Sequence, residues 1–377
     1  MNHNEDWAPL FESWRSRLET LIKEHPLQII SWEATRRCNL YCLHCGSPSE
    51  EGNLKAELST EEIVGAFDEI AADFDMSRFR HINITGGEPF VRNDLLEVLS
   101  AISKWPFYRN IDIQTNGVFI ADNPHILTDL KGVGVTGLGI SIDGFESTHD
   151  SLRGAAGAWA KAVHAARLAV EAGLVVTVSF VAHSKNVEEL PSFYDFIKRD
   201  VRPRVFRVMI IDPQGRAQEN SEYLLGPGQI RDAIKLLRAE YDGSCSTYSQ
   251  PSATMVELGC GGWLGVELEG RTRPFIFHCI AGINNLGILY DGKLASCSNI
   301  PREFIQGDLR EERIKHIWEE RYQQYRNFDW KKTGLCKDCD QWHYCHGGPM
   351  HIRTLSGAVS TCLFKKLCPS VTSVAEA

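Results

Sequence analysis

The sequence predicts an α/β fold, a partial (β/α)6 TIM-like barrel followed by a cysteine-rich C-terminal domain. Two observations support this fold class. Short Ile- and Val-rich segments alternate with amphipathic stretches as far as residue 211, and later the chain becomes rich in glycine and cysteine. Alternating strands and helices favour a parallel sheet joined by right-handed crossovers. The expected parts are an N-terminal helical extension (1–27), the barrel (28–217), a linker with one helix (218–254) and the cysteine-rich domain (255–377).

Six segments have the composition of parallel strands buried on both faces, because they are short and rich in Ile and Val. These predicted strands are Gln28–Glu33, Arg80–Thr85, Asn110–Thr115, Gly137–Ile142, Leu174–Val181 and Arg204–Ile211. Ser59 and Glu62 predict a capping box at the start of the first helix between strands. Residues 8–24 predict an amphipathic helix that packs on the core or on a partner. The other predicted helices are Asn93–Lys104, Ala158–Ala172, Val187–Lys198 and Ile230–Tyr241.

Charge and hydropathy disfavour several classes of partner. The net charge is −9 and the pI about 5.8, which disfavours tight binding to nucleic-acid phosphates. The most apolar run, Leu174–Ala182, is too short to cross a bilayer, and the N-terminus lacks the pattern of a secretory signal. We therefore expect a soluble cytoplasmic protein that binds neither nucleic acid nor membrane. Its 12 cysteines then indicate metal or iron–sulfur binding rather than disulfides.

The segment CNLYCLHC, after the first predicted strand, carries the strongest chemical signal. Its thiols, Cys38, Cys42 and Cys45, have the spacing C-x3-C-x2-C. A [4Fe–4S] cluster has four irons, so three thiolates leave one iron open to a ligand that is not protein, whereas a closed electron carrier uses four cysteines. A zinc site is the alternative, but zinc favours four ligands in paired C-x2-C knuckles, and the sequence has no fourth cysteine nearby.

Three further motifs stand at the ends of successive predicted strands: TGGEP (85–89), QTNG (114–117) and SIDG (141–144). Chemistry in parallel α/β barrels sits at the C-terminal ends of the strands, so we expect these motifs on one rim with CNLYCLHC. Together with the aromatic His44 before the last front cysteine, they resemble the radical S-adenosylmethionine (SAM) enzyme family. That resemblance implies that the open iron binds SAM, that one electron cleaves it, and that a 5′-deoxyadenosyl radical then takes hydrogen from a substrate.

The same resemblance assigns six residues to SAM. The TGGEP segment corresponds to the part that binds the methionyl amino group, and the asparagine of QTNG to a ribose contact. The serine of SIDG and the arginine of HDSLRG (149–154) correspond to contacts with the SAM carboxylate. The expected cofactor-binding residues are therefore Gly86, Gly87, Glu88, Asn116, Ser141 and Arg153. Without the resemblance, TGGEP would indicate only a turn, and Asp143 of SIDG could be an ordinary turn residue.

Asp212 is the candidate catalytic residue. It stands in IIDPQGRA, which resembles the segment that closes the sixth strand in family members with a C-terminal cluster domain. A carboxylate at this place would point into the barrel mouth and could act as a base toward the substrate. Asp is also common in turns and at helix caps, so a structural role stays open.

The C-terminal cysteines form a second group. Cys336, Cys339 and Cys345 have the spacing C-x2-C-x5-C, and Gly292-x4-Cys297 precedes them in a predicted hairpin with an Asp-Gly turn. This arrangement resembles the SPASM domain of radical SAM enzymes, which binds two auxiliary [4Fe–4S] clusters. The expected ligands are Cys260, Cys279, Cys297, Cys336, Cys339, Cys345 and Cys362. A zinc ribbon is the alternative, because C-x2-C knuckles suit zinc.

One position departs from the family pattern. Pro349 stands where the pattern has a further cysteine, and proline cannot bind iron. The missing ligand of the first auxiliary cluster could come from Cys260, from His346 or from His351, or one iron could be open. For the second auxiliary cluster, with Cys362 preferred to Cys368, the expected ligands are Cys336, Cys339, Cys345 and Cys362.

Enzymes with this two-part layout mostly modify proteins or peptides. The expected function is therefore a radical SAM oxidoreductase that oxidises or cross-links a peptide or protein, with electrons from a donor such as flavodoxin or ferredoxin. The first alternative is a sulfatase-type formylglycine maturase, against which Pro349 argues because those relatives keep the full auxiliary ligand set. The second is a metal-binding scaffold without catalysis.

Overall fold

One ten-stranded sheet, with the order β10-β9-β8-β1-β2-β3-β4-β5-β6-β7, forms the centre of the computed structural model, which describes residues 8–47, 49, 56–108, 110–244, 254–273 and 275–368. Every pair from β8 through β1 to β7 is parallel, whereas the β8–β9 and β9–β10 pairs are antiparallel. The strands are β1 (Ile29–Glu33), β2 (His81–Thr85), β3 (Ile111–Thr115), β4 (Val135–Ser141), β5 (Val175–Ala182), β6 (Val205–Ile210), β7 (Met255–Leu258), β8 (Asn285–Ile288), β9 (Lys293–Ala295) and β10 (Gly307–Asp308).

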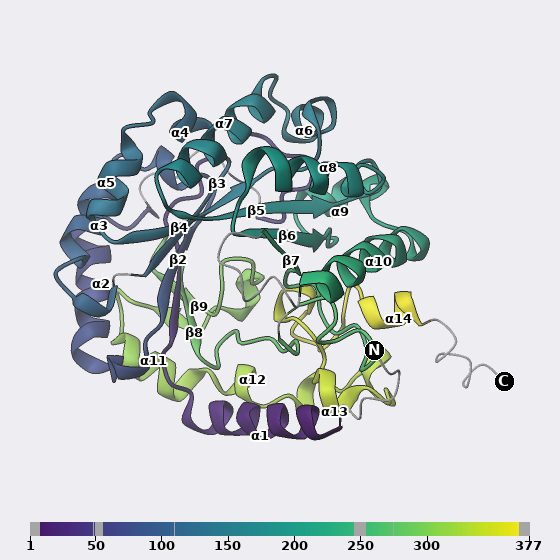
Figure 1. Cartoon of the computed structure of the whole chain (residues 1–377). Coiled ribbons are helices and arrows are strands. Elements are labelled where there is room, and N and C mark those ends of the chain that lie inside the picture. The colour runs from purple at the N-terminus through teal and green to yellow at the C-terminus, as the bar shows by residue number, and fades with distance from the viewer. Residues whose placement is uncertain are drawn as a thin grey trace.

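Helices connect successive parallel strands and cover the outer side of the sheet, as crossover connections require. Figure 1 shows the helices between β1 and β6 arranged around the outside of the strands. The helices are α1 (Ala8–Glu24), α2 (Thr60–Asp73), α3 (Leu95–Ile102), α4 (Val118–Asp122), α5 (Ile126–Gly132), α6 (Glu146–Arg153), α7 (Ala158–Glu171), α8 (Leu190–Phe196), α9 (Arg216–Glu219), α10 (Pro227–Ser244), α11 (Ile314–Arg321), α12 (Gln323–Arg326), α13 (Trp342–Cys345) and α14 (Leu363–Leu367).

The predicted barrel strands and helices are present. Each of the six expected strands begins and ends within two residues of its prediction, because the Ile and Val side chains of these segments are buried in the core. Burial on both faces, which the composition predicted, does not hold for β2 and β3, where buried residues alternate with half-buried ones. The predicted capping box closes the start of α2: the Ser59 side chain accepts from the Glu62 N–H, and the Glu62 side chain accepts from the Ser59 N–H. The predicted α/β fold class is confirmed.

The sheet is larger than the six predicted strands. β7 pairs with β6 through Phe206 and Val256, and β8 pairs with β1 through Ile30 and Leu286, so both additions are parallel. They come from the sequence that we assigned to the C-terminal domain, and each has four residues, too few for a clear strand pattern. Their pairing satisfies the backbone N–H and C=O groups that the edges of the six-stranded barrel would expose.

Helix α1 packs on the cysteine-rich domain, although the two are far apart in sequence. The ring of Phe11 lies 5.9 Å from that of Trp263 and 5.3 Å from that of Tyr344. Arg15 Nη1 lies 2.6 Å from His343 Nε2. Figure 1 shows α1 running along α12 and α13. The amphipathic helix predicted at residues 8–24 therefore buries its apolar face against the chain itself.

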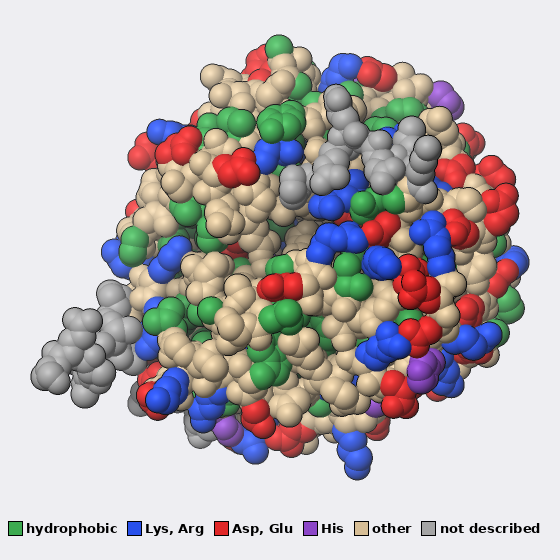
Figure 2. Space-filling model, turned by 180° about the vertical axis from the view of Figure 1, so that it is seen from behind, with side chains coloured by type: hydrophobic (Ala, Val, Ile, Leu, Met, Phe, Trp, Pro, Cys, Tyr) green, Lys and Arg blue, Asp and Glu red, His purple; other side chains and the backbone are tan. Residues whose placement is uncertain are grey.

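The molecular surface carries charges of both signs. Figure 2 shows Lys and Arg side chains interspersed with Asp and Glu on the face that is turned away in Figure 1. Among the helices that the structure describes, none combines the length and apolar character needed to span a membrane.

Candidate functional site

The three front thiols lie on the segment between β1 and α2. Arg216, at the start of α9, holds this segment by donating from Nε to the Cys42 carbonyl at 2.7 Å and from its backbone N–H to the Cys45 carbonyl at 3.0 Å. Burial is the main cause that raises the pKa of Cys38 to about 11, and the thiols of Cys42 and Cys45 raise it further, so the three are neighbours. A thiol with the pKa of Cys38 is protonated at neutral pH, and a bound metal would stabilise its thiolate form.

Gly86 and Gly87 allow the end of β2 to approach the residues just before Cys38. The Gly87 N–H donates to the Thr35 carbonyl at 2.7 Å, and the backbone carbonyls of Thr35 and Arg37 occupy the space that side chains at Gly86 and Gly87 would need. Gly86 also has a φ of 145°, which favours glycine. In this structure the close neighbour of the two glycines is the chain's own backbone, which fixes the start of the thiol segment.

Glu88 is a buried acceptor between β2 and β3. Its Oε1 accepts from Thr115 Oγ1 at 2.7 Å, and its Oε2 accepts from the Asn116 N–H at 2.8 Å. Burial raises the pKa of this carboxyl to about 7, and a ligand ammonium would lower that pKa by stabilising the anion. Asn116 donates from Nδ2 to Asn39 Oδ1 at 2.7 Å, which joins the end of β3 to the thiol segment.

Arg153, at the end of α6, forms a buried ion pair with Asp143. Its Nε and Nη2 donate to Asp143 Oδ2 at 2.9 and 2.6 Å, and its Nη1 lies 3.9 Å from Cys42 Sγ. Burial opposes ionisation of Asp143, but the guanidinium holds the pKa of its carboxyl below the usual range. The sequence left Asp143 open as a turn residue, whereas the structure shows it orienting Arg153 beside the thiols. The contact of Arg153 with the SAM carboxylate stays a prediction.

The predicted SAM-binding motifs share one rim. Gly86, Gly87 and Glu88 follow β2, Asn116 follows β3, and the half-buried Ser141 ends β4. Because β1 to β4 pair in parallel, their C-terminal ends meet at the same side of the sheet as the thiol segment.

Three histidines lie around Asp143: His44 is half-buried, and His149 and His183, which were not predicted, are buried. His149 Nδ1 accepts from the Asp143 N–H at 3.0 Å, and His183 Nδ1 accepts from the Lys185 N–H at 3.1 Å. Burial lowers the pKa of His44, His149 and His183 to about 4, so all three are neutral at pH 7. His44 Nδ1 and the Nε2 atoms of the other two are buried without a hydrogen-bond partner in the described part of the chain. The sequence could have indicated His183, because it directly follows β5 and residues at strand ends lie on the rim.

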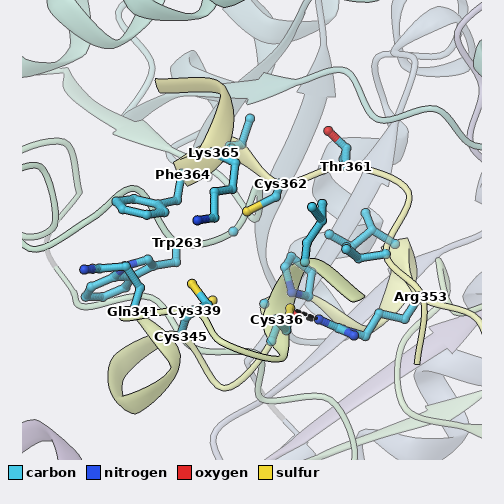
Figure 3. A pocket seen from close by; sticks show the side chains of 18 of the residues that line it. Trp263, Cys336, Cys339, Gln341, Cys345, Arg353, Thr361, Cys362, Phe364 and Lys365 are labelled. Atoms are coloured by element: carbon cyan, nitrogen blue, oxygen red, sulfur yellow. Dashed lines mark hydrogen bonds between the residues drawn. The ribbon is translucent and has the colours of Figure 1, made fainter. Parts of the chain in front are cut away.

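Four thiols of the C-terminal domain converge on one cavity. Figure 3 shows Cys336, Cys339, Cys345 and Cys362 around it, with Trp263 on one side. Burial raises the pKa of the Cys345 thiol to about 12, and Cys362 and Cys336 raise it further. Of the two alternatives that the sequence offered for the last ligand, Cys362 lines this cavity.

A second thiol group consists of Cys260, Cys279 and Cys297. Burial raises the pKa of Cys297 to about 12, and Cys279 adds to that shift and to the shift of Cys260, so the three thiols are neighbours. Cys260 is exposed to solvent, whereas Cys279 and Cys297 are half-buried. A Cβ at Gly262 would lie 3.3 Å from the ring of Pro349, which places that proline against the Cys260 segment.

A fully buried ion pair holds the Cys260 segment. Arg273 donates to Glu269 from Nη2 at 2.6 Å and from Nε at 3.1 Å. The same guanidinium donates to the Gly262 carbonyl at 2.7 Å and to the Gly259 carbonyl at 3.3 Å, on either side of Cys260. Both charged side chains are inaccessible to solvent. This pair could not be recognised in the sequence, because oppositely charged residues four apart normally indicate an exposed helix.

Asp212, the predicted catalytic residue, joins the barrel to the C-terminal domain. It follows β6, and its Oδ2 lies 3.0 Å from Nε2 of His351. Asp212 also contributes to the raised pKa of Cys260, after burial and the thiols of Cys279 and Cys297, so it faces that thiol group. The sequence named His351 only as a substitute iron ligand.

The donor sets and the unpartnered polar atoms fit the groups that the sequence predicts. Three front thiols can bind three irons of a cubane and leave the fourth for SAM. The unpartnered nitrogens of His44, His149 and His183 offer hydrogen bonds to polar atoms of a ligand at the same rim. In the C-terminal domain, the four thiols around one cavity are the number that a closed cluster needs.

A partial parallel barrel with three thiols at its rim, joined to a domain with further thiol groups, fits the class of iron–sulfur enzymes that keep one coordination site open. Residues 32–197 match the model of the radical SAM superfamily, and residues 279–340 match that of the SPASM iron–sulfur cluster-binding domain. The chain belongs to the radical SAM superfamily and carries a SPASM domain, so its cofactors are SAM and [4Fe–4S] clusters.

Several curated proteins are similar to this chain. The Fe-coproporphyrin III synthase of Methanosarcina barkeri is 32% identical over 210 residues, which span 55% of this chain and half of that protein. The AdoMet-dependent heme synthase of the same organism is 26% identical over 85% of this chain and 90% of its own length. The PqqA peptide cyclase of Rhizobium meliloti is 28% identical over 87% of this chain and 84% of its own length.

Solved structures show the same fold. Native anSMEcpe with bound AdoMet and Cp18Cys peptide superposes with a TM-score of 0.64 at 19% identity, over 92% of this chain and 95% of that one. Streptococcus suis SuiB bound to precursor peptide SuiA superposes with a TM-score of 0.63 at 16% identity, over 92% of this chain and 77% of that one.

Proposed function

We propose that this chain is a radical SAM oxidoreductase that oxidises or cross-links a peptide or protein, with an electron donor such as flavodoxin or ferredoxin as partner. The alignment with a PqqA peptide cyclase over most of both chains supports this substrate class. When bound, the front cluster and SAM supply the one-electron cleavage that generates the 5′-deoxyadenosyl radical. The chain supplies the binding and positioning residues and a proton acceptor.

The contact between Asp212 and His351 carries this proposal. Asp212 stands three residues before Gly215, which lies against the Cys45 carbonyl of the rim, and Asp212 is also near the Cys260 thiol; both observations support the proposal. A substrate between the front and auxiliary thiols would therefore meet Asp212. After hydrogen abstraction, formation of a new bond releases one proton and one electron. Asp212 can accept the proton while His351 orients it, and an auxiliary cluster, when bound, would accept the electron.

Around this position, the ion pair of Asp143 and Arg153 supports the cofactor side. It holds the remaining N–H groups of Arg153 beside Cys42, where a carboxylate could receive them. Glu88 offers a buried acceptor for an ammonium group on the same rim. We assign these residues, with Asn116 and Ser141, to SAM.

Anaerobically reconstituted protein with SAM, dithionite and peptides encoded beside its gene tests the activity. We expect 5′-deoxyadenosine and a peptide mass loss of about two hydrogens per new bond. Asp212→Asn should retain 5′-deoxyadenosine formation and lose peptide product by about 10²–10⁴-fold, the usual contribution of a general base. Equal peptide product from wild type and Asp212→Asn would remove Asp212 from the mechanism.

A tetrapyrrole is the second candidate substrate, because the heme synthase of M. barkeri aligns over 85% of this chain. Incubation with iron coproporphyrin III in place of a peptide separates the two. Conversion of the porphyrin, with peptide masses unchanged, would replace peptide modification by porphyrin modification.

A further inference from the structure

Two buried cations lie among the auxiliary thiols. Arg353 is 2% exposed and Lys331 is 1% exposed, although both carry long charged side chains. Such side chains are almost never fully buried unless they are paired. Their position therefore needs an anionic partner inside the protein.

The guanidinium of Arg353 is fixed against one thiol of the four-thiol cavity. Its Nη2 lies 3.0 Å from Cys336 Sγ, the contact drawn as a dashed line in Figure 3. Its Nε donates to the Gly347 carbonyl at 2.8 Å, and its Nη1 donates to the carbonyls of Lys331 and Gly357 at 3.2 and 2.5 Å. Three carbonyl contacts leave the guanidinium little freedom, so the Nη2 group stays directed at the sulfur.

Lys331 lies near thiols of both groups. Its ammonium lies 4.7 Å from the ring centre of Phe328, and its stem packs on Gly347, where an added Cβ would lie 3.1 Å from the Lys331 Cβ. Burial lowers its pKa to about 8, and the thiols of Cys279 and Cys345 oppose that shift. Cys279 belongs to one thiol group and Cys345 to the other, so one ammonium acts on both.

The charge of an iron–sulfur cluster changes with its redox state. Reduction adds one negative charge, and hydrogen bonds to the sulfurs and nearby charges set the potential at which it occurs. Burying a cation is unfavourable unless an anion lies nearby to compensate its charge. A reduced cluster can supply that negative charge. Buried cations beside the thiols therefore stabilise the reduced form more than the oxidised form.

We propose that Lys331 and Arg353 are positioning residues that raise the reduction potential of the auxiliary clusters, with Arg353 acting on the cluster at Cys336 and Lys331 acting on both. Neither residue contacts the front thiols in this assignment, so the potential of the front cluster is independent of them. These potentials do not depend on whether the enzyme modifies a peptide or another substrate.

A redox titration of the holoenzyme followed by electron paramagnetic resonance tests this proposal. Addition of SAM identifies the front-cluster signal, and the remaining signals report the auxiliary clusters. At the potential where the wild-type auxiliary clusters are half reduced, Lys331→Met should lower the ratio of reduced to oxidised cluster about tenfold, a shift of about 59 mV for one electron. Lys331→Arg, which keeps the charge, should remain close to wild type.

Lys332→Met is the matched control, because the same change falls on the next residue, which is exposed. It should leave all potentials unchanged. Arg353→Lys should lower the potential of one auxiliary cluster, since it keeps the charge and loses the fixed N–H toward Cys336. Wild-type potentials in Lys331→Met would overturn the proposal.

Iron and sulfide per chain are measured for each variant. Loss of auxiliary iron in Lys331→Met with retention in Lys331→Arg would show that the charge itself is required, as proposed. Loss in both variants would show that the residue only maintains the fold, and would overturn the electrostatic role.

Discussion

The two halves of this molecule hold their thiols in different ways. In the barrel, regular strands and helices bring the front segment to the rim, and backbone contacts such as Arg216 to Cys45 fix it. In the C-terminal domain the elements are short, and buried charged side chains, Arg273 and Arg353, hold the loops. The barrel has a buried ion pair too, Asp143 with Arg153, but its stability is also spread over many regular elements. The cysteine-rich half has few such elements, so it depends more on its buried polar contacts.

The largest effect is expected at the front thiols, where the barrel half carries the chemistry. Cys42→Ala removes one of three thiolate ligands, so formation of 5′-deoxyadenosine should fall to background and iron per chain should decrease. The matched control is Cys368→Ala, a free thiol outside both predicted auxiliary sets, which should keep SAM cleavage. Normal cleavage in Cys42→Ala would contradict the assignment of the front site.

The next largest effect, on the free energy of unfolding, is expected in the C-terminal half. Glu269→Ala leaves Arg273 buried and unpaired, and this change should lower the free energy of unfolding by about 3–5 kcal/mol in urea titrations. Asp232→Ala breaks an exposed pair with Lys235 on α10 and should cost at most about 1 kcal/mol. Equal losses in the two variants would remove the proposed difference between the halves.

A pH-dependent effect is expected from Glu88. Its pKa of about 7 in the folded state lies above the ordinary 4.5, so the folded protein binds this proton more tightly than the unfolded chain. The resulting stabilisation is fully present below about pH 4.5 and lost as the pH rises to about 7, with a total of about 3 kcal/mol. Relative to Glu88→Gln, wild type without SAM should lose that stability across this range in urea unfolding. Parallel pH profiles of the two proteins would contradict the shift.

The smallest effect should come from a regular element of the barrel. Ser59→Ala removes the side-chain cap of α2 and should lower the free energy of unfolding by about 1 kcal/mol. Ser59→Asn keeps a capping acceptor and should remain near wild type in the same urea measurement. A loss as large as that of Glu269→Ala would show that single contacts are equally important in both halves.

Much of the barrel and of the front site could be predicted from the sequence. Short strands rich in Ile and Val have a local signature, and the spacing of Cys38, Cys42 and Cys45 needs no knowledge of distant residues. Because the C-terminal ends of parallel strands meet at one rim, the sequence also predicts that Glu88 and Asn116 lie near these thiols.

The remaining features depend on contacts between distant segments. Glu269 and Arg273 resemble an exposed pair in the sequence, and their burial follows from the loop that they hold. Lys331 lies in an ordinary polar stretch, and its burial near thiols of both groups becomes visible only in three dimensions. β7 and β8 are too short for a pattern and form strands because the barrel edges offer hydrogen-bond partners.

The pairing of β7 and β8 with the barrel has a consequence for any shortened form of the protein. A fragment that stops at residue 217 would present two unprotected strands, β1 and β6, to its surroundings. Such strands readily recruit other chains, so this fragment is expected to self-associate rather than fold as a separate unit. The last third of the chain thus also prevents aggregation by pairing with the edge strands of the barrel.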